Sequence, residues 1–440
     1  MNVIYLHTHD SGRYLDPTNS PRPLPHIERL AAGSVTFRNA FSTAPTCSPS
    51  RSALLTGTTP HVNGMTGLAH RGFRLKDYSA HIRRVFAEAG AETVLCGVQH
   101  VAPDRSEIGY DRFLDGPDDY FSYPPLDPAE WDLENAGRVD SFLRDSHERP
   151  FFLSFGLLTT HRPYPEPEGG KPDRSYPPPP AVVADTPENR YDSERFHTAL
   201  SIVDRIVGTV LDAVSAAGLW EDTVILLTTD HGPAFPEMKS TLSDGGIGVS
   251  LLLRVPGVAD DGRVEQSLVS QLDVYPTICE LLGISPPAGI EGQSLLPLLR
   301  GEQGRVREAV FAETNYHANY EPSRGVRTER YKLIRRYARE AARLPANVDD
   351  SPPKQVLREA GYFEMPAPRD QLIDLVIDPT ERLNFAGERA YREVYEHLGG
   401  LLEEWMERTE DPLRSGRVPR PAGSQVNRQD AESAEEPTYE

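Results

Sequence analysis

Two short apolar runs constrain the fold most, because each leads directly into a carboxylate and an imidazole. Residues 3–6 precede His9-Asp10, and residues 224–227 precede Asp230-His231. Such runs are typical of strands that are buried on both faces. Segments with helical spacing alternate with strand-like segments along the chain. The pattern predicts an α/β fold with a mostly parallel central sheet flanked by helices.

The ends of these two strands form the first candidate site. In open α/β sheets, ligands bind outside the carboxyl ends of the parallel strands. Two carboxylates and two imidazoles that converge there would suit a divalent cation. The alternative interpretation is that Asp10 and Asp230 each cap a turn, because Gly12 and Gly232 follow them closely.

The chain divides by pattern into three parts. Residues 1–325 are expected to form the large catalytic α/β domain. Residues 326–413 are expected to form a smaller α+β domain built on an antiparallel sheet. Residues 414–440 are polar, with little apolar content, and are expected to be disordered. A segment rich in Pro and Gly, residues 163–185, is expected either to border a site or to be disordered.

Composition excludes several classes of function. Lys and Arg number 46 against 66 Asp and Glu, which gives a net charge of −20 and disfavours a binder of nucleic acid or anionic membranes. No apolar window is long enough to span a bilayer. The N-terminus lacks the pattern of a signal peptide, so a cytoplasmic location is expected. An anionic substrate would therefore require a local basic pocket.

Cys47 differs from the other two cysteines, Cys96 and Cys279, which lie in apolar runs typical of core thiols. It opens the segment Cys-Ser-Pro-Ser-Arg just ahead of a predicted helix at residues 50–56. A helix N-terminus and the nearby Arg51 would favour an anion, lower the pKa of the thiol and make it a nucleophile. The alternative is a half-buried cysteine in a turn.

The run of residues 47–57, CSPSRSALLTG, resembles the first signature of the sulfatase family, within the alkaline-phosphatase superfamily. It contains the C-x-P-x-R pattern that the formylglycine-generating enzyme recognises. Residues 270–283, 289–301, 331–334 and 374–379 resemble later segments of the family. Residues 39–67, 149–153 and 230–236 resemble most the heparan N-sulfatase group, that is, the N-sulfoglucosamine sulfohydrolases.

The resemblance implies a mechanism. The formylglycine-generating enzyme would oxidise Cys47 to formylglycine, whose hydrate attacks the sulfur of a sulfated substrate. It also implies one divalent cation, with calcium as the first expectation. Because His231 would offer an imidazole nitrogen as a ligand, Mn²⁺ and Zn²⁺ are alternative identities for this cation. The ligand positions are Asp10, Cys47, Asp230, His231 and His9.

The resemblance also implies catalytic roles for four further residues. Arg51 would orient the hydrate and the sulfate, and Lys239 would be a second cation on the sulfate. His100 would deprotonate the second hydroxyl of the hydrate, and His161 would contact the sulfate and help to protonate the leaving group. The alternatives are a structural ion pair for Arg51, structural loop histidines for His100 and His161, and a solvated surface position for Lys239.

Two positions depart from the family pattern. His9 stands where the family usually has Asp, and Val98 stands where it usually has a sulfate-binding Lys. The predicted function is hydrolysis of a sulfuric ester or N-sulfate, with a sulfated saccharide as substrate. Two alternatives stay open: a phosphoester or phosphonate hydrolase of the same superfamily, and a non-catalytic binding protein that keeps the fold.

Overall fold

A mixed eight-stranded sheet forms the centre of the molecule in this computed structural model, which describes residues 1–115, 127–167, 170, 175–338, 343–427 and 438–439. The strand order is β10-β2-β9-β7-β1-β6-β4-β5. β1 runs parallel to both β6 and β7, and β9 runs antiparallel to β7 and β2. The predicted mostly parallel sheet is thus confirmed. The strands are Asn2–Thr8 (β1), Val35–Phe37 (β2), Glu92–Gly97 (β4), Arg112–Phe113 (β5), Phe151–Gly156 (β6), Thr223–Thr229 (β7), Leu251–Arg254 (β9) and Val264–Glu265 (β10).

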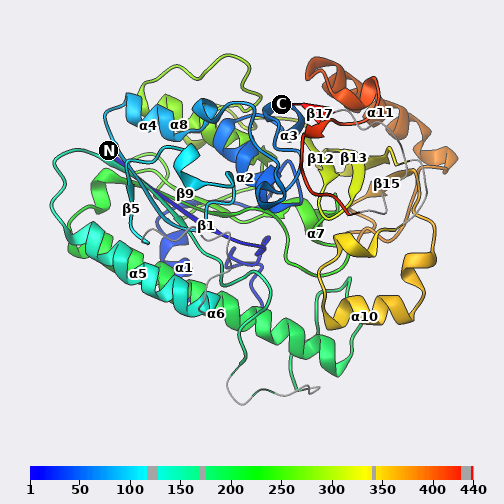
Figure 1. Cartoon of the computed structure of the whole chain (residues 1–440), viewed down its shortest axis with the longest axis horizontal. Helices are drawn as coiled ribbons and strands as arrows, with labels where there is room; N and C mark the ends of the chain where they lie inside the picture. The colour runs from blue at the N-terminus through cyan, green and yellow to red at the C-terminus, as the bar shows by residue number, and fades with distance from the viewer. Residues whose placement is uncertain (116–126, 168–169, 171–174, 339–342, 428–437, 440) are drawn as a thin grey trace.

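Helices cover both faces of this sheet (Figure 1). One apolar core joins the sheet to the helices Pro25–Ala31 (α1), Pro128–Arg144 (α5) and Pro187–Ala216 (α6). A second core joins the opposite face to Cys47–Thr56 (α2), Arg83–Glu88 (α4) and Val274–Leu282 (α8). The buried residues of the long helix α6, among them Val203, Ile206, Val207 and Val210, follow helical spacing. Thr186 caps its first turn by accepting a hydrogen bond from the backbone of Asn189.

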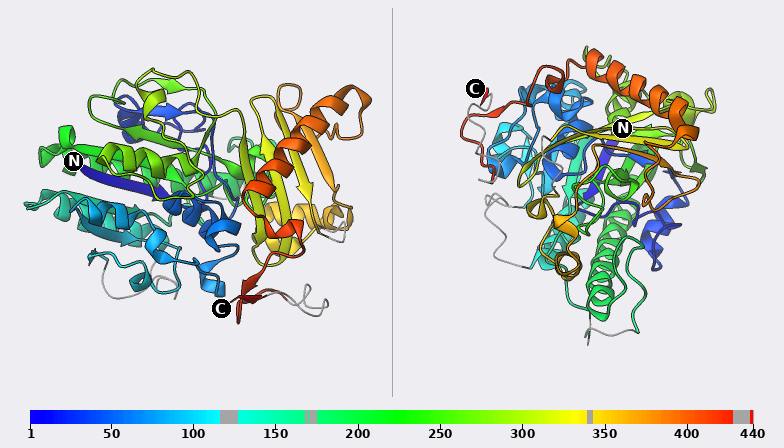
Figure 2. Two further views of the ribbon diagram at one scale, coloured as in Figure 1. Left: turned by 90° about the horizontal axis from the view of Figure 1, so that it is seen from above. Right: turned by 90° about the vertical axis from the view of Figure 1, so that its right-hand side faces the viewer.

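A second, antiparallel sheet follows, with the order β12-β13-β14-β15. Its strands are Val310–Tyr316 (β12), Tyr320–Arg327 (β13), Tyr331–Arg336 (β14) and Asp370–Asp374 (β15). Helix α11, Arg392–Arg408, lies across one face of it (Figure 2) and buries Leu398, Leu402, Trp405 and Met406 there. The predicted smaller α+β part on an antiparallel sheet is thus confirmed. β12 begins ahead of residue 326, and the exact domain boundaries stay a proposal.

Short elements complete the described chain. A three-stranded sheet combines Ala40–Phe41 (β3), Gly248–Val249 (β8) and Val269–Ser270 (β11). The short helices are Pro60–Asn63 (α3), Asp244–Ile247 (α7), Leu296–Leu299 (α9) and Pro352–Glu359 (α10). Within the described ranges, no helix is both long and apolar enough to cross a membrane.

Part of the C-terminal tail is packed, although residues 414–440 were expected to be disordered. Val418 is fully buried between two tyrosines: its carbonyl accepts from the hydroxyl of Tyr316 at 2.7 Å, and its amide donates to that of Tyr320 at 3.0 Å. These two rings offer an apolar surface and hydrogen bonds that the polar composition of the tail did not indicate. Arg420–Pro421 (β16) pairs with Thr438–Tyr439 (β17). Residues 428–437 and 440 lie outside the described residues.

A buried polar cluster ties the second sheet to helix α3. The guanidinium of Arg324 in β13 makes two hydrogen bonds to Asp411, which follows α11, and lies 3.7 Å from Glu313 in β12. Glu313 in turn accepts from the backbone of His61 in α3 at 2.8 Å and from its ring. All four side chains are buried. Because an unpaired charge is costly in such a place, each member depends on the others.

The cluster gives a prediction for stability. Replacing Asp411 with Ala leaves the Arg324 guanidinium buried beside fewer acceptors, so the free energy of unfolding should fall by about 3–5 kcal/mol. Denaturant unfolding, followed by circular dichroism, measures this. The control Asp212→Ala removes an exposed ion pair with Arg29 and should cost under about 1 kcal/mol. Equal losses in the two variants would contradict a special role for the buried cluster.

Candidate functional site

The parallel pairing of β1 and β7 brings the two predicted carboxylates together. Thr8 and Thr229 are opposite each other in the register, so both strands end at the same edge of the sheet. The backbone amide of Asp10 donates to Asp230 Oδ1 at 2.9 Å, and so does the amide of His231. Asp10 adopts a left-handed backbone with φ of 46°. The interpretation of these residues as mere turn caps does not account for this direct contact.

Helix α2 supplies Cys47 and Arg51 to the same place. The helix starts at Cys47 itself, three residues earlier than predicted, and places Arg51 one turn further along. Both side chains are almost fully buried. Cys47 Sγ lies 3.4 Å from His231 Nε2. Arg51 Nη2 lies 3.0 Å from Asp230 Oδ2 and donates to the carbonyl of Thr8 at 2.9 Å.

The five residues predicted as metal ligands form one cluster. One ligand atom from each of His9, Asp10, Cys47 and Asp230 lies within 4.8 Å of the others. His231 Nε2 is 3.3 Å from Asp10 Oδ1 and 3.7 Å from Asp230 Oδ2. His9 Nδ1 is 2.9 Å from Asp10 Oδ1 and 3.2 Å from Asp230 Oδ2. Carboxylate oxygens and imidazole nitrogens thus converge on one point.

The protonation states fit a cation. Burial raises the pKa of the Asp10 carboxyl, but the charges of Lys239 and His231 outweigh it and hold the pKa well below its usual range. Burial also raises the pKa of the Asp230 carboxyl, but the charges of His231 and Arg51 outweigh burial, so the pKa is lowered. Burial lowers the pKa of His9 to about 4. Ionised carboxylates and a neutral imidazole are the forms that bind metal.

Lys239 is buried, which contradicts the alternative of a solvated surface position. Its Nζ donates to Asp10 Oδ2 at 2.7 Å and lies 3.4 Å from Asp349 Oδ2. Burial lowers the pKa of the ammonium, but Asp10 and Asp349 outweigh burial and raise the pKa well above its usual value. The site therefore holds two permanent cations, Arg51 and Lys239, beside its two carboxylates.

His100 and His161 follow the adjacent strands β4 and β6 and also reach the cluster. The His9 ring lies 5.5 Å from that of His100 and 4.8 Å, edge to face, from that of His161. His100 has a left-handed backbone with φ of 54°. Burial lowers the pKa of His100 well below its usual value, so this imidazole is a neutral acceptor at neutral pH.

The pKa of the Cys47 thiol is shifted in the opposite direction to the one expected from the sequence. Its position at a helix N-terminus near Arg51 predicted a lowered pKa. Instead, burial raises the pKa of the thiol well above its usual value, and the lowering effects of Lys239 and Arg51 do not compensate. Desolvation of the charged form is the larger effect in so closed a site. Cys47 is thus a protonated thiol, and a simple thiolate nucleophile is disfavoured.

Three residues near the site were missed. His70 Nδ1 lies 3.1 Å from His100 Nε2, with the two rings stacked. Asp349 contacts Lys239 as described above. Burial lowers the pKa of His317 to about 3, and Lys239 contributes to the lowering. His317 and Asp349 come from the part of the chain beyond β11, and no local motif marks any of the three, so only the tertiary fold reveals them.

Known proteins show which family has this arrangement. Residues 1–284 match the family model described as Sulfatase, and residues 238–352 match the model described as N-sulphoglucosamine sulphohydrolase, C-terminal. The human N-sulphoglucosamine sulphohydrolase is 29% identical over 92% of this chain and 88% of its own. An ulvan-active sulfatase of Formosa agariphila is 30% identical over 90% of this chain and 77% of its own. The solved structure of a 2-O GAG sulfatase superposes with a TM-score of 0.75 at 19% identity, covering 100% of this chain and 98% of that chain. The chain belongs to the sulfatase family.

Proposed function

We propose that this sulfatase removes a sulfate group from a sulfated saccharide, with formylglycine made from Cys47 as its nucleophile. The observation that carries the proposal is the single buried cluster of Asp10, Cys47 and Asp230, whose ligand atoms lie within 4.8 Å of one another. The names of two relatives support a sugar substrate, since one acts on N-sulphoglucosamine and the other on ulvan. Either an ester sulfate or an N-sulfate fits this chemistry.

Oxidation of Cys47 by a formylglycine-generating enzyme resolves the problem of its raised pKa, because the thiol is then no longer the nucleophile. The aldehyde adds water to give two hydroxyls on one carbon. One hydroxyl oxygen attacks sulfur, and the bond from sulfur to the leaving oxygen or nitrogen breaks. The second hydroxyl then loses its proton, the C=O bond reforms, and sulfate leaves with the attacking oxygen. A plain serine or cysteine lacks this second hydroxyl.

One divalent cation fits the donor set of Asp10, Asp230, His231, His9 and the modified residue 47. We propose calcium, in line with the oxygen donors, while the imidazoles are also compatible with Mn²⁺ or Zn²⁺. When bound, the cation would neutralise sulfate oxygens and lower the pKa of a bound hydroxyl.

The remaining groups have complementary tasks. The fixed charges of Arg51 and Lys239 would hold sulfate oxygens and stabilise the transition state. His161 would donate a proton to the leaving alcohol or amine. His100, kept neutral by burial, would accept the proton from the second hydroxyl. Val98 is buried and brings no charge, so binding of sulfate would depend on Arg51, Lys239 and the cation.

The nucleophile can be tested directly. Mass spectrometry of the peptide that contains residue 47 should show an aldehyde in protein produced together with a formylglycine-generating enzyme. Cys47→Ser should lower multiple turnover of sulfate by at least about 1,000-fold, because its sulfate ester cannot release sulfate by reforming a carbonyl. Cys279→Ser, at a buried thiol of α8, is the matched control and should retain activity. Full activity with an intact thiol at residue 47 would refute the proposal.

The metal site can be tested without an activity assay. Asp230→Ala removes a buried ligand, so elemental analysis of the purified protein should show metal content falling from about one ion per chain to a small fraction of that. The same measurement identifies the ion. Asp140→Ala, which alters an exposed pair on α5 with Arg144, should keep full content. An unchanged metal content in Asp230→Ala would place the ion elsewhere.

Substrate class is the third test. With N-sulfoglucosamine, a sugar O-sulfate, a phosphate monoester and a phosphonate monoester as a panel, kcat/KM should be at least about tenfold higher for a sulfated sugar than for either phosphorus compound. A chelator should abolish the activity. Preference for a phosphorus ester would instead identify a phosphoester or phosphonate hydrolase. Binding of sulfated sugars with no turnover by aldehyde-bearing, metal-loaded protein would identify a binding protein.

A further inference from the structure

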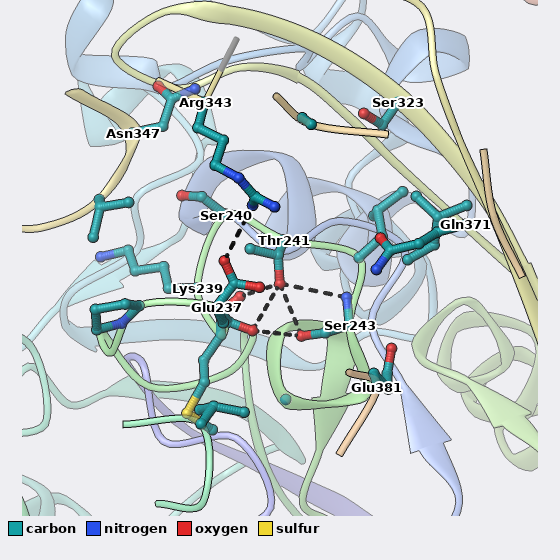
Figure 3. A pocket seen from close by; sticks show the side chains of 18 of the residues that line it. Glu237, Lys239, Ser240, Thr241, Ser243, Ser323, Arg343, Asn347, Gln371 and Glu381 are labelled. Atoms are coloured by element: carbon teal, nitrogen blue, oxygen red, sulfur yellow. Dashed lines mark hydrogen bonds and ion pairs between the residues drawn. The ribbon is translucent and has the colours of Figure 1, made fainter. Parts of the chain in front are cut away.

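A cavity of about 320 Å³ lies beside the catalytic cluster and is lined in part by the loop that carries Lys239. Its walls include this loop (residues 236–243), the antiparallel sheet, and Arg343, Leu344, Asn347 and Val348 (Figure 3). Lys239 Nζ contacts Asp10 of the catalytic cluster and the nearby Asp349, and Lys239 also lines the cavity, together with Glu237 and Ser243 of the same loop. A volume of this size falls within the range of about 300–1,000 Å³ that is usual for small-molecule sites.

The sheet presents its polar face to this cavity. Thr314, Ser323 and Arg336 are opposite one another on neighbouring strands and all line it. Ile334 and Gln371 form the adjacent row. Successive residues of a strand point to opposite faces. Leu333 and Leu372 therefore pack on the α11 side, while hydroxyl, amide and guanidinium groups remain on the cavity side.

The lining is rich in groups that bind hydroxylated molecules. The hydroxyls of Thr241 and Ser243 both donate to the carbonyl of Glu237, at 3.1 and 2.8 Å, and so hold the loop in shape. Gln371 and Ser323 face the space from the sheet (Figure 3). The ring of Tyr362 also lines the space. Hydroxyl and amide groups around such a space suit a sugar, whose hydroxyls need hydrogen-bonding partners.

Arg343 gives the cavity a positive charge that its neighbours only partly balance. Its Cζ lies 4.2 Å from the centroid of the Tyr362 ring, its Nη1 donates to the Tyr362 hydroxyl, and the guanidinium lies 3.6 Å from the Glu237 carboxylate. Its Nε is buried and has no hydrogen-bond partner among the described residues. The other two carboxylates are already paired, Glu321 with Arg336 and Glu381 with Lys332. A planar guanidinium with an unused donor fits a carboxylate or sulfate.

We propose that this cavity is a second binding site for an acidic sugar unit, whose carboxylate or sulfate pairs with Arg343. The acidic sugar has two possible sources: a remote residue of the same oligosaccharide that the catalytic cluster acts on, or a separate molecule. The proposal does not depend on the chemistry of Cys47, because binding is measured without turnover. A failure of the formylglycine proposal therefore leaves this one standing, and the reverse also holds.

Calorimetric titration with glucuronic acid tests the site, and glucose serves as the uncharged comparison. The wild-type chain should bind glucuronic acid saturably and glucose more weakly. Arg343→Met keeps the packing on Tyr362 but removes the charge, and should weaken binding of glucuronic acid about tenfold or more. Arg358→Met, at an exposed arginine of α10 outside the cavity, is the matched control and should bind like the wild type.

Gln371→Leu provides a second variant in case Arg343→Met does not fold, and should weaken binding severalfold. Saturable binding that neither Arg343→Met nor Gln371→Leu alters would overturn the proposal, as would the absence of saturable binding to the wild type.

Kinetics then identify the source of the acidic unit. If it belongs to the substrate, Arg343→Met raises KM for a sulfated oligosaccharide more than for a sulfated monosaccharide. If it is a separate molecule, added glucuronic acid changes the rate on the monosaccharide, and Arg343→Met removes that change.

Discussion

The pairing of two ionised carboxylates, Asp10 and Asp230, at the ends of adjacent parallel strands is the constraint on which the site depends. Isolated carboxylates in a closed interior would take up protons rather than remain charged. Here Arg51, Lys239 and the nearby imidazoles lower both pKa values despite burial. Each charge therefore depends on the others. The ionised form of Asp230 depends in part on Arg51, which helix α2 places at the edge of the sheet.

The balance of charge also explains how such a site can accept both a cation and an anion. The two carboxylates and the two fixed cations, Arg51 and Lys239, sum to zero. A divalent cation would compete with Lys239 for Asp10 and with Arg51 for Asp230, which would release both side chains toward an anion. A bound cation would in turn favour a sulfate anion beside it. The raised pKa of Cys47 fits the same picture, because a thiolate would add uncompensated negative charge.

The sequence predicts the parts of this arrangement that local patterns encode. The apolar runs that end in His9-Asp10 and Asp230-His231 locate two strand ends correctly, and a parallel sheet brings such ends together. The start of α2 at Cys47 and the sign of its pKa shift are not predictable in this way, since both depend on burial by the rest of the fold. Asp349 reaches Lys239 across more than a hundred residues of sequence. The packing of Val418 likewise depends on two tyrosines from two other strands, Tyr316 of β12 and Tyr320 of β13.

The smaller sheet is attached to the rest of the protein through a buried polar cluster. The buried cluster of His61, Glu313, Arg324 and Asp411 spans α3, two strands of the second sheet and the end of α11, so it fixes that sheet against the large domain. Asp349, in the segment between β14 and β15, lies 3.4 Å from Lys239. The polar face of the sheet lies toward the loop of residues 236–243, across the cavity. This loop therefore borders both places, because Lys239 contacts Asp10 in the catalytic cluster and also lines the cavity.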